Sequence, residues 1–441
     1  MSKNIHNYAE MHLNDFLDYL AIPSVSAENK GIDEASDWLV KTFEQLGAKK
    51  SEKWAKEGQN PFVYAEFEGK SAKTVLFYNH YDVQPAQPLD EWKTEPFNPT
   101  FVEGKLVARG ASDDKGELMA RLVMVKWFQE NGGLPVNLKF FVEGEEEIGS
   151  LHVDEAVREH AKELKADACI WEGGGKNSVG RFEVISGMKG IVSFDVEAVT
   201  ADVDMHSSLA CFAPNAAWRL VQGLATLKDK NGRITVDGFY DDVDDLTDLE
   251  KKAVAQMDFD EEKVKETFGL KRDFITDKPA YAFVNEPTMT INGLTSGYEG
   301  EGVKTVLPKY AKAKLDCRLV PGQDPEKMVK LVEAHLKKNG FADLKVTFNL
   351  GENAFRSDSD HAFVKLAMAT AKKVYGDRQV KYVPNAAGGG PIECFGNVLK
   401  LPIVLVGVHN AASGAHAPNE HILVSDFSQG VEYLTELLQN F

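Results

Sequence analysis

Long apolar runs are missing from this 441-residue chain, and cysteines are few. No run approaches the roughly 20 apolar residues of a membrane-spanning helix, and the N-terminal segment lacks the apolar stretch of a signal peptide. The four cysteines form no Cys-x-x-Cys pair and no framework typical of secreted proteins. These absences favour a cytoplasmic protein with no membrane partner.

Positively charged residues are also fewer than negatively charged ones. The chain has 50 lysines and arginines against 68 aspartates and glutamates, which gives a formal net charge of −18 at pH 7. Such a chain repels the phosphates of nucleic acids and of anionic membranes, so neither is expected as a partner. The length suits two or three domains with a sizeable core.

Apolar runs that end in histidine or acid are what the chain does contain. In TVLFYNHYD, residues 74–82, an expected buried strand ends at His80 and Asp82. Residues i and i+2 of a strand point to the same side, so the imidazole and the carboxylate would lie side by side. Neutral histidine binds borderline metals, and a neighbouring carboxylate fixes its orientation. A single His-x-Asp is more often an ordinary surface pair.

The same arrangement recurs at three other places. The segments 136–150, 167–175 and 401–416 each begin as an expected strand and then reach acid or histidine. The candidate side chains at these ends are Glu145, Glu146, Glu147, Glu172 and His416. Open α/β sheets bind ligands at the carboxyl ends of their strands. We therefore expect these side chains to converge on one edge of a sheet.

Two aspartates, Asp113 and Asp114, stand at the start of an expected helix over 110–133. Carboxylates at a helix N-terminus accept backbone N–H groups and suit the helix dipole. Capping alone would explain this pair. Asp113 joins the candidate ligands only because the strand ends supply the rest of a cluster.

The middle of the chain follows a different pattern. Segments that resemble half-exposed strands lie at 190–199, 281–293 and 310–320, with helices between them. This pattern predicts a smaller α+β domain inserted into an α/β domain. The expected catalytic domain covers 1–189 and 354–441 and has a mixed, mostly parallel sheet flanked by helices. The insertion covers 190–353.

The collected side chains suit two divalent metals. Two histidines and several carboxylates without a thiolate are typical ligands of zinc, manganese or cobalt. They are too many for one tetrahedral zinc with an open position, but they suffice for two metals that share a carboxylate. Such a pair activates water and polarises a carbonyl, and a remaining carboxylate can move the proton to a leaving amine. The residues alone predict amide hydrolysis without deciding which of Glu145, Glu146 and Glu147 is the base.

Five segments resemble, in order, the motifs of the co-catalytic zinc exopeptidases and deacylases. They are HYD, GASDDKG, EGEEEIGS, the acid after CIW, and GAHAPNE. This family includes carnosinase-like dipeptidases, aminoacylase, carboxypeptidase G-type enzymes, acetylornithine deacetylase and succinyl-diaminopimelate desuccinylase. The dipeptidase branch is the most similar. The resemblance implies two metals per subunit, zinc first and manganese or cobalt as alternatives.

The resemblance also implies a role for each candidate. His80 and Glu172 would hold one metal, Glu147 and His416 the other, and Asp113 would bridge them. Asp82 would orient His80, and Glu146 would be the general base.

The inserted domain would then be a lid that carries the contact of a homodimer. His206, in DMHSSL, would reach the partner subunit's site and stabilise the oxyanion, although the residue alone is just a loop histidine. Arg318 would bind the carboxylate of a small peptide substrate, although a surface charge at a strand end explains it equally. Thr305 would line the same pocket. Gly389 and Gly390 would let the backbone approach the ligand, as would any tight turn.

Two positions depart from the dipeptidase pattern. Glu172 stands where carnosinase-like enzymes usually have Asp, and Gly390 aligns where they tend to have Ser. The leading hypothesis is a two-metal dipeptidase. An N-acyl-amino-acid deacylase or a carboxypeptidase is the alternative in the same chemical class. A peptide-binding homologue without catalysis is the alternative from another class.

Overall fold

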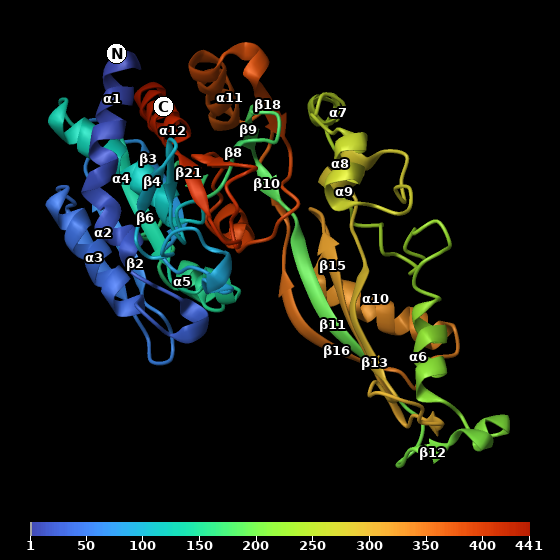
Figure 1. Ribbon diagram of the computed structural model, residues 1–441. Coiled ribbons are helices and arrows are strands. Elements are labelled where there is room, and N and C mark those ends of the chain that lie inside the picture. Colours follow the sequence, from blue (N-terminus) through green and yellow to red (C-terminus); the bar gives the residue numbers. More distant parts are fainter. Residues whose placement is uncertain (1) are drawn as a thin grey trace. The chain divides into compact units, whose positions relative to one another are not determined.

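The computed structural model describes residues 2–441, and backbone contacts divide them into two compact units (Figure 1). Unit 1 comprises the chain up to Gly187, Arg356–Pro384 and Gly390–Phe441. Unit 2 comprises Met188–Phe355 and Asn385–Gly389. A smaller domain is thus inserted into the chain of a larger one, as the sequence predicts.

Unit 1 is built on a mixed ten-stranded sheet. Its order is β1-β2-β6-β3-β7-β19-β9-β8-β20, and β18 pairs with β9. These strands are β1 (Lys50–Trp54), β2 (Phe62–Phe67), β3 (Thr74–His80), β6 (Asn137–Glu143), β7 (Ala168–Trp171), β8 (Gly175–Lys176), β9 (Phe182–Ile185), β18 (Val380–Val383), β19 (Ile403–Leu405) and β20 (His409–Asn410). The four central strands β6, β3, β7 and β19 run parallel, so their carboxyl ends meet at one edge.

Helices flank this sheet. They are α1 (Ser2–His12), α2 (Leu17–Ala21), α3 (Ile32–Gln45), α4 (Lys115–Glu130), α5 (Val153–Glu159), α11 (Ala362–Tyr375) and α12 (Val424–Asn440). The side chains of β3 from Val75 to His80 are buried, as in a strand covered on both faces. Most of α4 is buried too, which explains its apolar sequence. A small second sheet joins β4 (Thr100–Val102), β5 (Lys105–Val107) and β21 (His421–Leu423).

Unit 2 contains a four-stranded antiparallel sheet of order β13-β15-β11-β16. The strands are β11 (Gly190–Val199), β13 (Thr290–Ser296), β15 (Tyr310–Leu319) and β16 (Lys345–Glu352). Burial alternates along β11, as expected for a sheet with one covered face. The covered face packs with α6 (Ala216–Leu224) and α10 (Pro325–Lys338) in one core. The other helices and strands of unit 2 are α7 (Asp248–Val254), α8 (Glu261–Phe268), α9 (Pro279–Asn285), β12 (Met205–His206) and β14 (Val306–Leu307). Two short strands, β10 (Gly187–Met188) and β17 (Phe355–Arg356), lie at the boundary between the units.

The strand expected over 281–293 is wrong in its first half. That half belongs to helix α9, and the strand β13 begins only at Thr290. Pro279 starts the helix, where its fixed φ and missing N–H cost nothing. Pro287 follows the helix and disfavours helical geometry at the residue before it.

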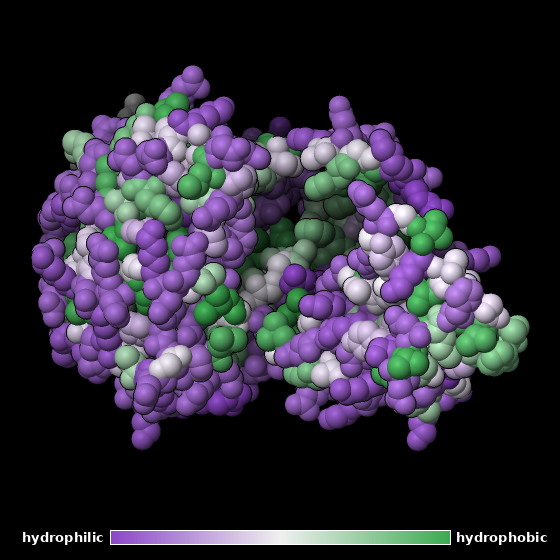
Figure 2. Space-filling model, turned by 60° about the horizontal axis from the view of Figure 1, so that its bottom comes forward, coloured by the Kyte–Doolittle hydropathy of each residue, from purple (hydrophilic) through white to green (hydrophobic). Residues whose placement is uncertain are grey.

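The mixed α/β class with an inserted α+β domain is confirmed. Among the described residues, no helix combines the length and apolar character needed to cross a bilayer. The face of the molecule in Figure 2 is mainly hydrophilic, with hydrophobic side chains in separate patches.

Candidate metal centre

Parallel strands bring the sequence-predicted candidates of unit 1 together. His80 is the last residue of β3, and it lies opposite Glu143 at the end of β6. Glu172 directly follows β7, which pairs with β3 on its other side. The loop after β6 turns into a short 3₁₀ helix, Glu146–Ile148. Three chain segments that are distant in sequence thus deliver histidine and carboxylates to one sheet edge.

Two groups of potential ligands form there. The ligand atoms of His80, Asp114 and Glu172 lie within 4.8 Å of one another, and so do those of Asp113, Glu147 and His416. Asp113 contacts both histidines, with Oδ1 2.9 Å from His80 Nε2 and Oδ2 3.0 Å from His416 Nε2. One carboxylate therefore turns one oxygen to each group, which is the arrangement that a bridging ligand needs.

Asp114 is a member of the centre that the sequence reasoning missed. Its side chain makes no capping hydrogen bond with α4, so capping does not explain the aspartate pair. Asp114 Oδ2 instead accepts hydrogen bonds from His80 N at 3.0 Å and Asn79 Nδ2 at 2.6 Å. The two successive acids were the available signal, but sequence could not direct their side chains.

The His80 ring is held from behind by Asp82. His80 Nδ1 lies 3.0 Å from the backbone oxygen of Asp82 and 3.4 Å from its Oδ1. A carbonyl oxygen only accepts, so Nδ1 carries a proton, and in the neutral ring Nε2 keeps the lone pair that a metal binds. The Asp82 carboxylate also accepts the backbone N–H groups of Glu146 and Glu147, at 3.3 and 3.0 Å. One aspartate thus fixes both the ring and the glutamate loop.

The three successive glutamates differ in their partners. Glu145 is buried, and its Oε2 lies 2.6 Å from His152 Nδ1. Glu147 accepts a hydrogen bond from Gln84 Nε2 at 2.8 Å and faces the second ligand group. The Glu146 carboxylate makes no hydrogen bond to any other part of the described chain. Of these three glutamates, Glu146 is therefore the one whose carboxylate is free to exchange a proton.

Negative charge dominates the centre. Burial raises the pKa of Glu146 to about 7 and that of Asp114 to about 6, and it raises the pKa of Glu172 well above its usual range. Hydrogen bonds with two carboxylates raise the pKa of His416 to about 10. The carboxylates outnumber the positively charged groups around them, and the atoms that could bind a metal are carboxylate oxygens and imidazole nitrogens. Two divalent cations of the zinc or manganese type fit this donor set.

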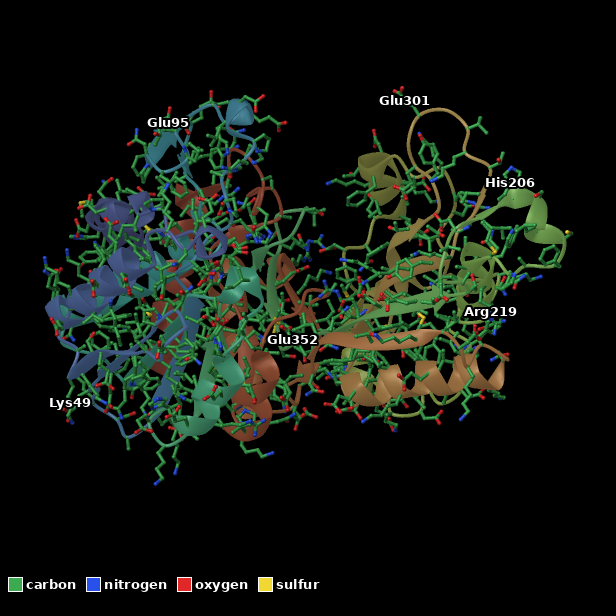
Figure 3. The ribbon with its side chains drawn as sticks, turned by 90° about the horizontal axis from the view of Figure 1, so that it is seen from below. Lys49, Glu95, His206, Arg219, Glu301 and Glu352 are labelled. Atoms are coloured by element: carbon green, nitrogen blue, oxygen red, sulfur yellow. The ribbon has the colours of Figure 1, made fainter. Side chains whose placement is uncertain are left out.

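His206 and Thr305 are neighbours in unit 2. β12 pairs with β14, and Ser207 N donates to Thr305 O at 3.1 Å. Thr305 Oγ1 lies 3.5 Å from His206 Nε2, and both side chains are exposed. In Figure 3, His206 lies toward the end of unit 2 away from Glu352.

Arg318 lies in the four-stranded sheet of unit 2, near the end of β15. It pairs with Ile191 of β11, and Glu352 pairs with Ile191 from the opposite side. A Cβ atom at Gly389 would come within 3.1 Å of Arg318 Nη1, so glycine permits this close approach. Gly390 is assigned to unit 1, so the structure does not group it with Arg318.

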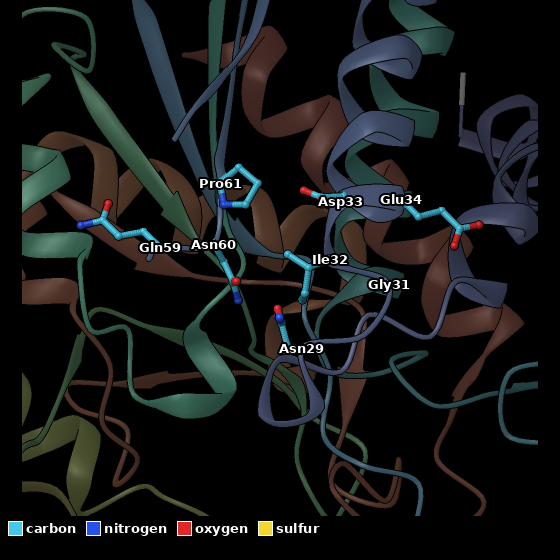
Figure 4. A pocket seen from close by; sticks show the side chains of 8 residues that line it. All are labelled: Asn29, Gly31, Ile32, Asp33, Glu34, Gln59, Asn60 and Pro61. Atoms are coloured by element: carbon cyan, nitrogen blue, oxygen red, sulfur yellow. The ribbon is translucent and has the colours of Figure 1, made fainter. Parts of the chain in front are cut away.

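A cavity of about 430 Å³ also lies in unit 1. Residues from two segments, 29–34 and 59–61, line it, and the Glu34 carboxylate points away from the other lining side chains (Figure 4). Asn60 connects its wall to the glutamate loop, because Asn60 N donates to Glu145 Oε1 at 2.9 Å. None of the candidate ligands lines this cavity, so it is separate from the metal centre.

Comparison with known proteins identifies the family. The model of the peptidase family M20/M25/M40 matches residues 76–440. The chain belongs to this family. The resemblance drawn from the five motifs is therefore confirmed, and so is the assignment to the metallopeptidases.

Individual relatives of this M20 chain are similar over most of their length. The Cys-Gly metallodipeptidase dug1 of Schizosaccharomyces pombe is 31% identical, over 94% of this chain and 92% of its own. The β-Ala-His dipeptidase of Mus musculus is 30% identical, over 84% of this chain and 77% of its own. The crystal structure of the M20 family metallo-carboxypeptidase Sso-CP2 from Sulfolobus solfataricus matches with a TM-score of 0.89 and 39% identity, over 97% and 98% of the two chains.

Proposed function

We propose that this M20 protein is a two-metal exopeptidase that hydrolyses the amide bond of dipeptides or short peptides. The observation that carries the proposal is Asp113, which turns one carboxylate oxygen to each of two histidines. His80 and Glu172 would hold one metal, and Glu147 and His416 the other. Zinc is the first candidate, with manganese and cobalt as alternatives. The relatives named as dipeptidases support a peptide substrate.

The residues around the metals have distinct tasks. When bound, the metals supply Lewis-acid polarisation of the scissile carbonyl and make water more acidic. Glu146 takes the proton of the attacking water and passes it to the leaving amine nitrogen. Asp82 keeps the His80 ring in place, and Asp114 fixes the backbone N–H of His80. These contacts set the positions of the groups before substrate arrives.

His206 is suited to stabilise the oxyanion. Its Nδ1 lies 3.2 Å from Ser208 N, which donates a hydrogen bond to it. Nδ1 is thereby the acceptor, so the proton of the neutral ring sits on Nε2 and can be donated to a developing negative charge.

Replacing His206 by alanine is expected to lower kcat by about 100- to 1,000-fold, the usual loss on removing one oxyanion donor. The metal content of this variant should equal that of the wild type, because the histidine is not a ligand. Steady-state kinetics and metal analysis check both points, with His361→Ala as a control for an exposed histidine of unit 1. An unchanged kcat would remove His206 from the mechanism.

The geometry of unit 2 supports a homodimer. Arg318 lies opposite Ile191, whereas His206 lies beyond the Val199 end of β11. The eight residue-to-residue steps from Ile191 to Val199 span about 26 Å, while a dipeptide spans about 7 Å. One subunit therefore cannot apply both residues to the same dipeptide. We propose that His206, with Thr305 beside it, serves the partner subunit's site, and that Arg318, with Gly389 as a further contact, binds substrate.

An exposed apolar surface supports the same contact. Phe212, Trp218 and Val221 lie on or beside α6 and are 76%, 66% and 42% exposed. Hydrophobic side chains gather at the right-hand end of Figure 2, over this part of unit 2. Large exposed aromatics are typical of protein interfaces.

A cytoplasmic location stays a prediction.

A matched substrate panel tests the function. Metal-stripped protein supplied with zinc or manganese is offered free dipeptides, the same dipeptides N-acetylated, and N-acyl amino acids. Cleavage of free dipeptides alone is expected. Cleavage of N-acetylated dipeptides would favour the carboxypeptidase alternative, which the similarity to Sso-CP2 supports. Cleavage of N-acyl amino acids alone would favour a deacylase, and no cleavage with two metals bound would favour a binding protein.

A further inference from the structure

Glu420 follows His416 by four residues and has no task in the chemistry proposed above. We propose that Glu420 is a positioning residue that joins the loop of Asp113 to the loop of His416 and thereby sets the metal affinity of the centre. This inference rests on the proposed metal-binding roles of these two residues. It extends them to a buried carboxylate outside both ligand groups.

Each of the two carboxylate oxygens of Glu420 accepts two hydrogen bonds. The side chain is 0% exposed. Its Oε1 accepts hydrogen bonds from the backbone N–H groups of Ser112 and Asp113, at 2.8 and 2.9 Å. Its Oε2 accepts from Gly110 N at 3.0 Å and from Arg109 Nη1 at 2.6 Å. One carboxylate thus accepts three of the five backbone N–H groups of residues 109–113, together with the Arg109 guanidinium.

Strand pairing explains how Glu420 reaches this segment. β21 runs antiparallel to β5, with His421 opposite Val107. The next contact outward joins Ala108 N to the backbone oxygen of Glu420, at 3.1 Å. The glutamate is therefore fixed by its own main chain just where the chain leaves β5 for Asp113. Its side chain can reach back over the departing loop.

The residue after Glu420 closes the loop that carries His416. His421 N donates to Ser413 O at 2.8 Å, which closes the loop around the histidine. His416 itself has a φ of 62°, in the left-handed region. A short loop with this backbone has little freedom once its end is fixed. Glu420 thus connects one ligand of the second group to the carboxylate that lies between both groups.

A purely structural role for Glu420 makes a different prediction. Its ion pair with Arg109 is fully buried, so breaking it should destabilise the fold whatever happens at the metal centre. Positioning requires in addition that the folded protein binds metal more weakly. Metal affinity of the folded variant separates the two roles.

The test is Glu420→Gln. The amide keeps the shape, but its NH₂ group cannot accept the N–H bonds that one carboxylate oxygen now receives. The affinity for zinc alone, measured by chelator competition at a temperature where the variant is folded, should fall about 10- to 100-fold, as for other residues that orient metal ligands. The absorption spectrum of the cobalt form should shift as well. A variant that binds two zinc ions with wild-type affinity would overturn the proposal.

Glu432→Gln is the matched control. Glu432 is also buried, at 8% exposed, and pairs with His6 without contacting either ligand group. It should lose stability and keep its zinc affinity. A loss of zinc affinity as large as that of Glu420→Gln would reduce Glu420 to a structural residue.

Hydrogen exchange keeps the proposal testable if Glu420→Gln does not fold. In metal-stripped wild-type protein, the amides of Gly110, Ser112 and Asp113 should exchange slowly, because Glu420 holds them without metal. Exchange as fast as in an exposed loop would overturn the inference. The substrate panel separates this inference from the function. Wild-type protein that cleaves nothing while Glu420→Gln binds zinc weakly would remove the peptidase function and leave the positioning role.

Discussion

Replacing Glu146 by glutamine is expected to lower kcat by about 100- to 10,000-fold while the protein still binds both metals. Glutamine has the shape of glutamate but cannot take a proton from water. The Glu146 carboxylate has no hydrogen-bond partner in the described chain, so its replacement leaves the surrounding contacts intact. Steady-state kinetics measures kcat, and metal analysis of the same preparation measures the metal content.

Glu145→Gln is the control for this prediction. Glu145 is the neighbouring residue, but its carboxylate is tied to Asn60 and His152 and does not belong to either ligand group. Its replacement should affect stability more than kcat. Loss of metal from Glu146→Gln would mean that the base and a ligand have been exchanged. Equal losses of kcat in both variants would mean that the base is not identified.

Replacing Asp113 by alanine is expected to remove both metals and with them all measurable turnover. Each oxygen of this carboxylate faces a different histidine, so its removal is expected to weaken metal binding at both positions and not at one alone. The variant also leaves the histidines without their shared acceptor. Metal content after dialysis, measured per subunit, should fall from two to near zero.

Asp426→Asn provides the comparison for Asp113. Asp426 is buried, and its Oδ1 accepts a hydrogen bond from Lys176 Nζ at 2.7 Å, outside both ligand groups. This variant should keep two metals. An Asp113→Ala protein that also keeps two metals would exclude the bridging role, and one that keeps a single metal would assign Asp113 to one position only.

Strand ends were the predictable part of this molecule. The apolar run before His80 indicated a buried strand, and the run before Glu172 indicated another. Parallel pairing of β3 and β7 was the one assumption needed to bring their ends together, and it is borne out by the register Phe77 opposite Ile170. A local pattern succeeds here because the period of a strand fixes which side chains share a face.

Contacts between distant segments were not predictable. Glu145 differs from Glu146 through Asn60, which comes from another segment, and through His152, which lies beyond EGEEEIGS, so no spacing within that motif encodes these partners. Asp114 looked like a helix cap because sequence shows where an acid stands but not where it points. Glu420 lies 307 positions from Asp113, whose N–H it accepts. Such contacts depend on strand pairing that only the folded chain contains.

Activity against metal equivalents is the most direct test of the central claim. Metal-stripped protein is titrated with zinc or manganese, and hydrolysis of one free dipeptide is followed at each ratio. The account predicts no turnover without metal and a rise that levels off at two equivalents per subunit. Turnover that survives complete metal removal, or full activity with no dependence on added metal, would contradict it.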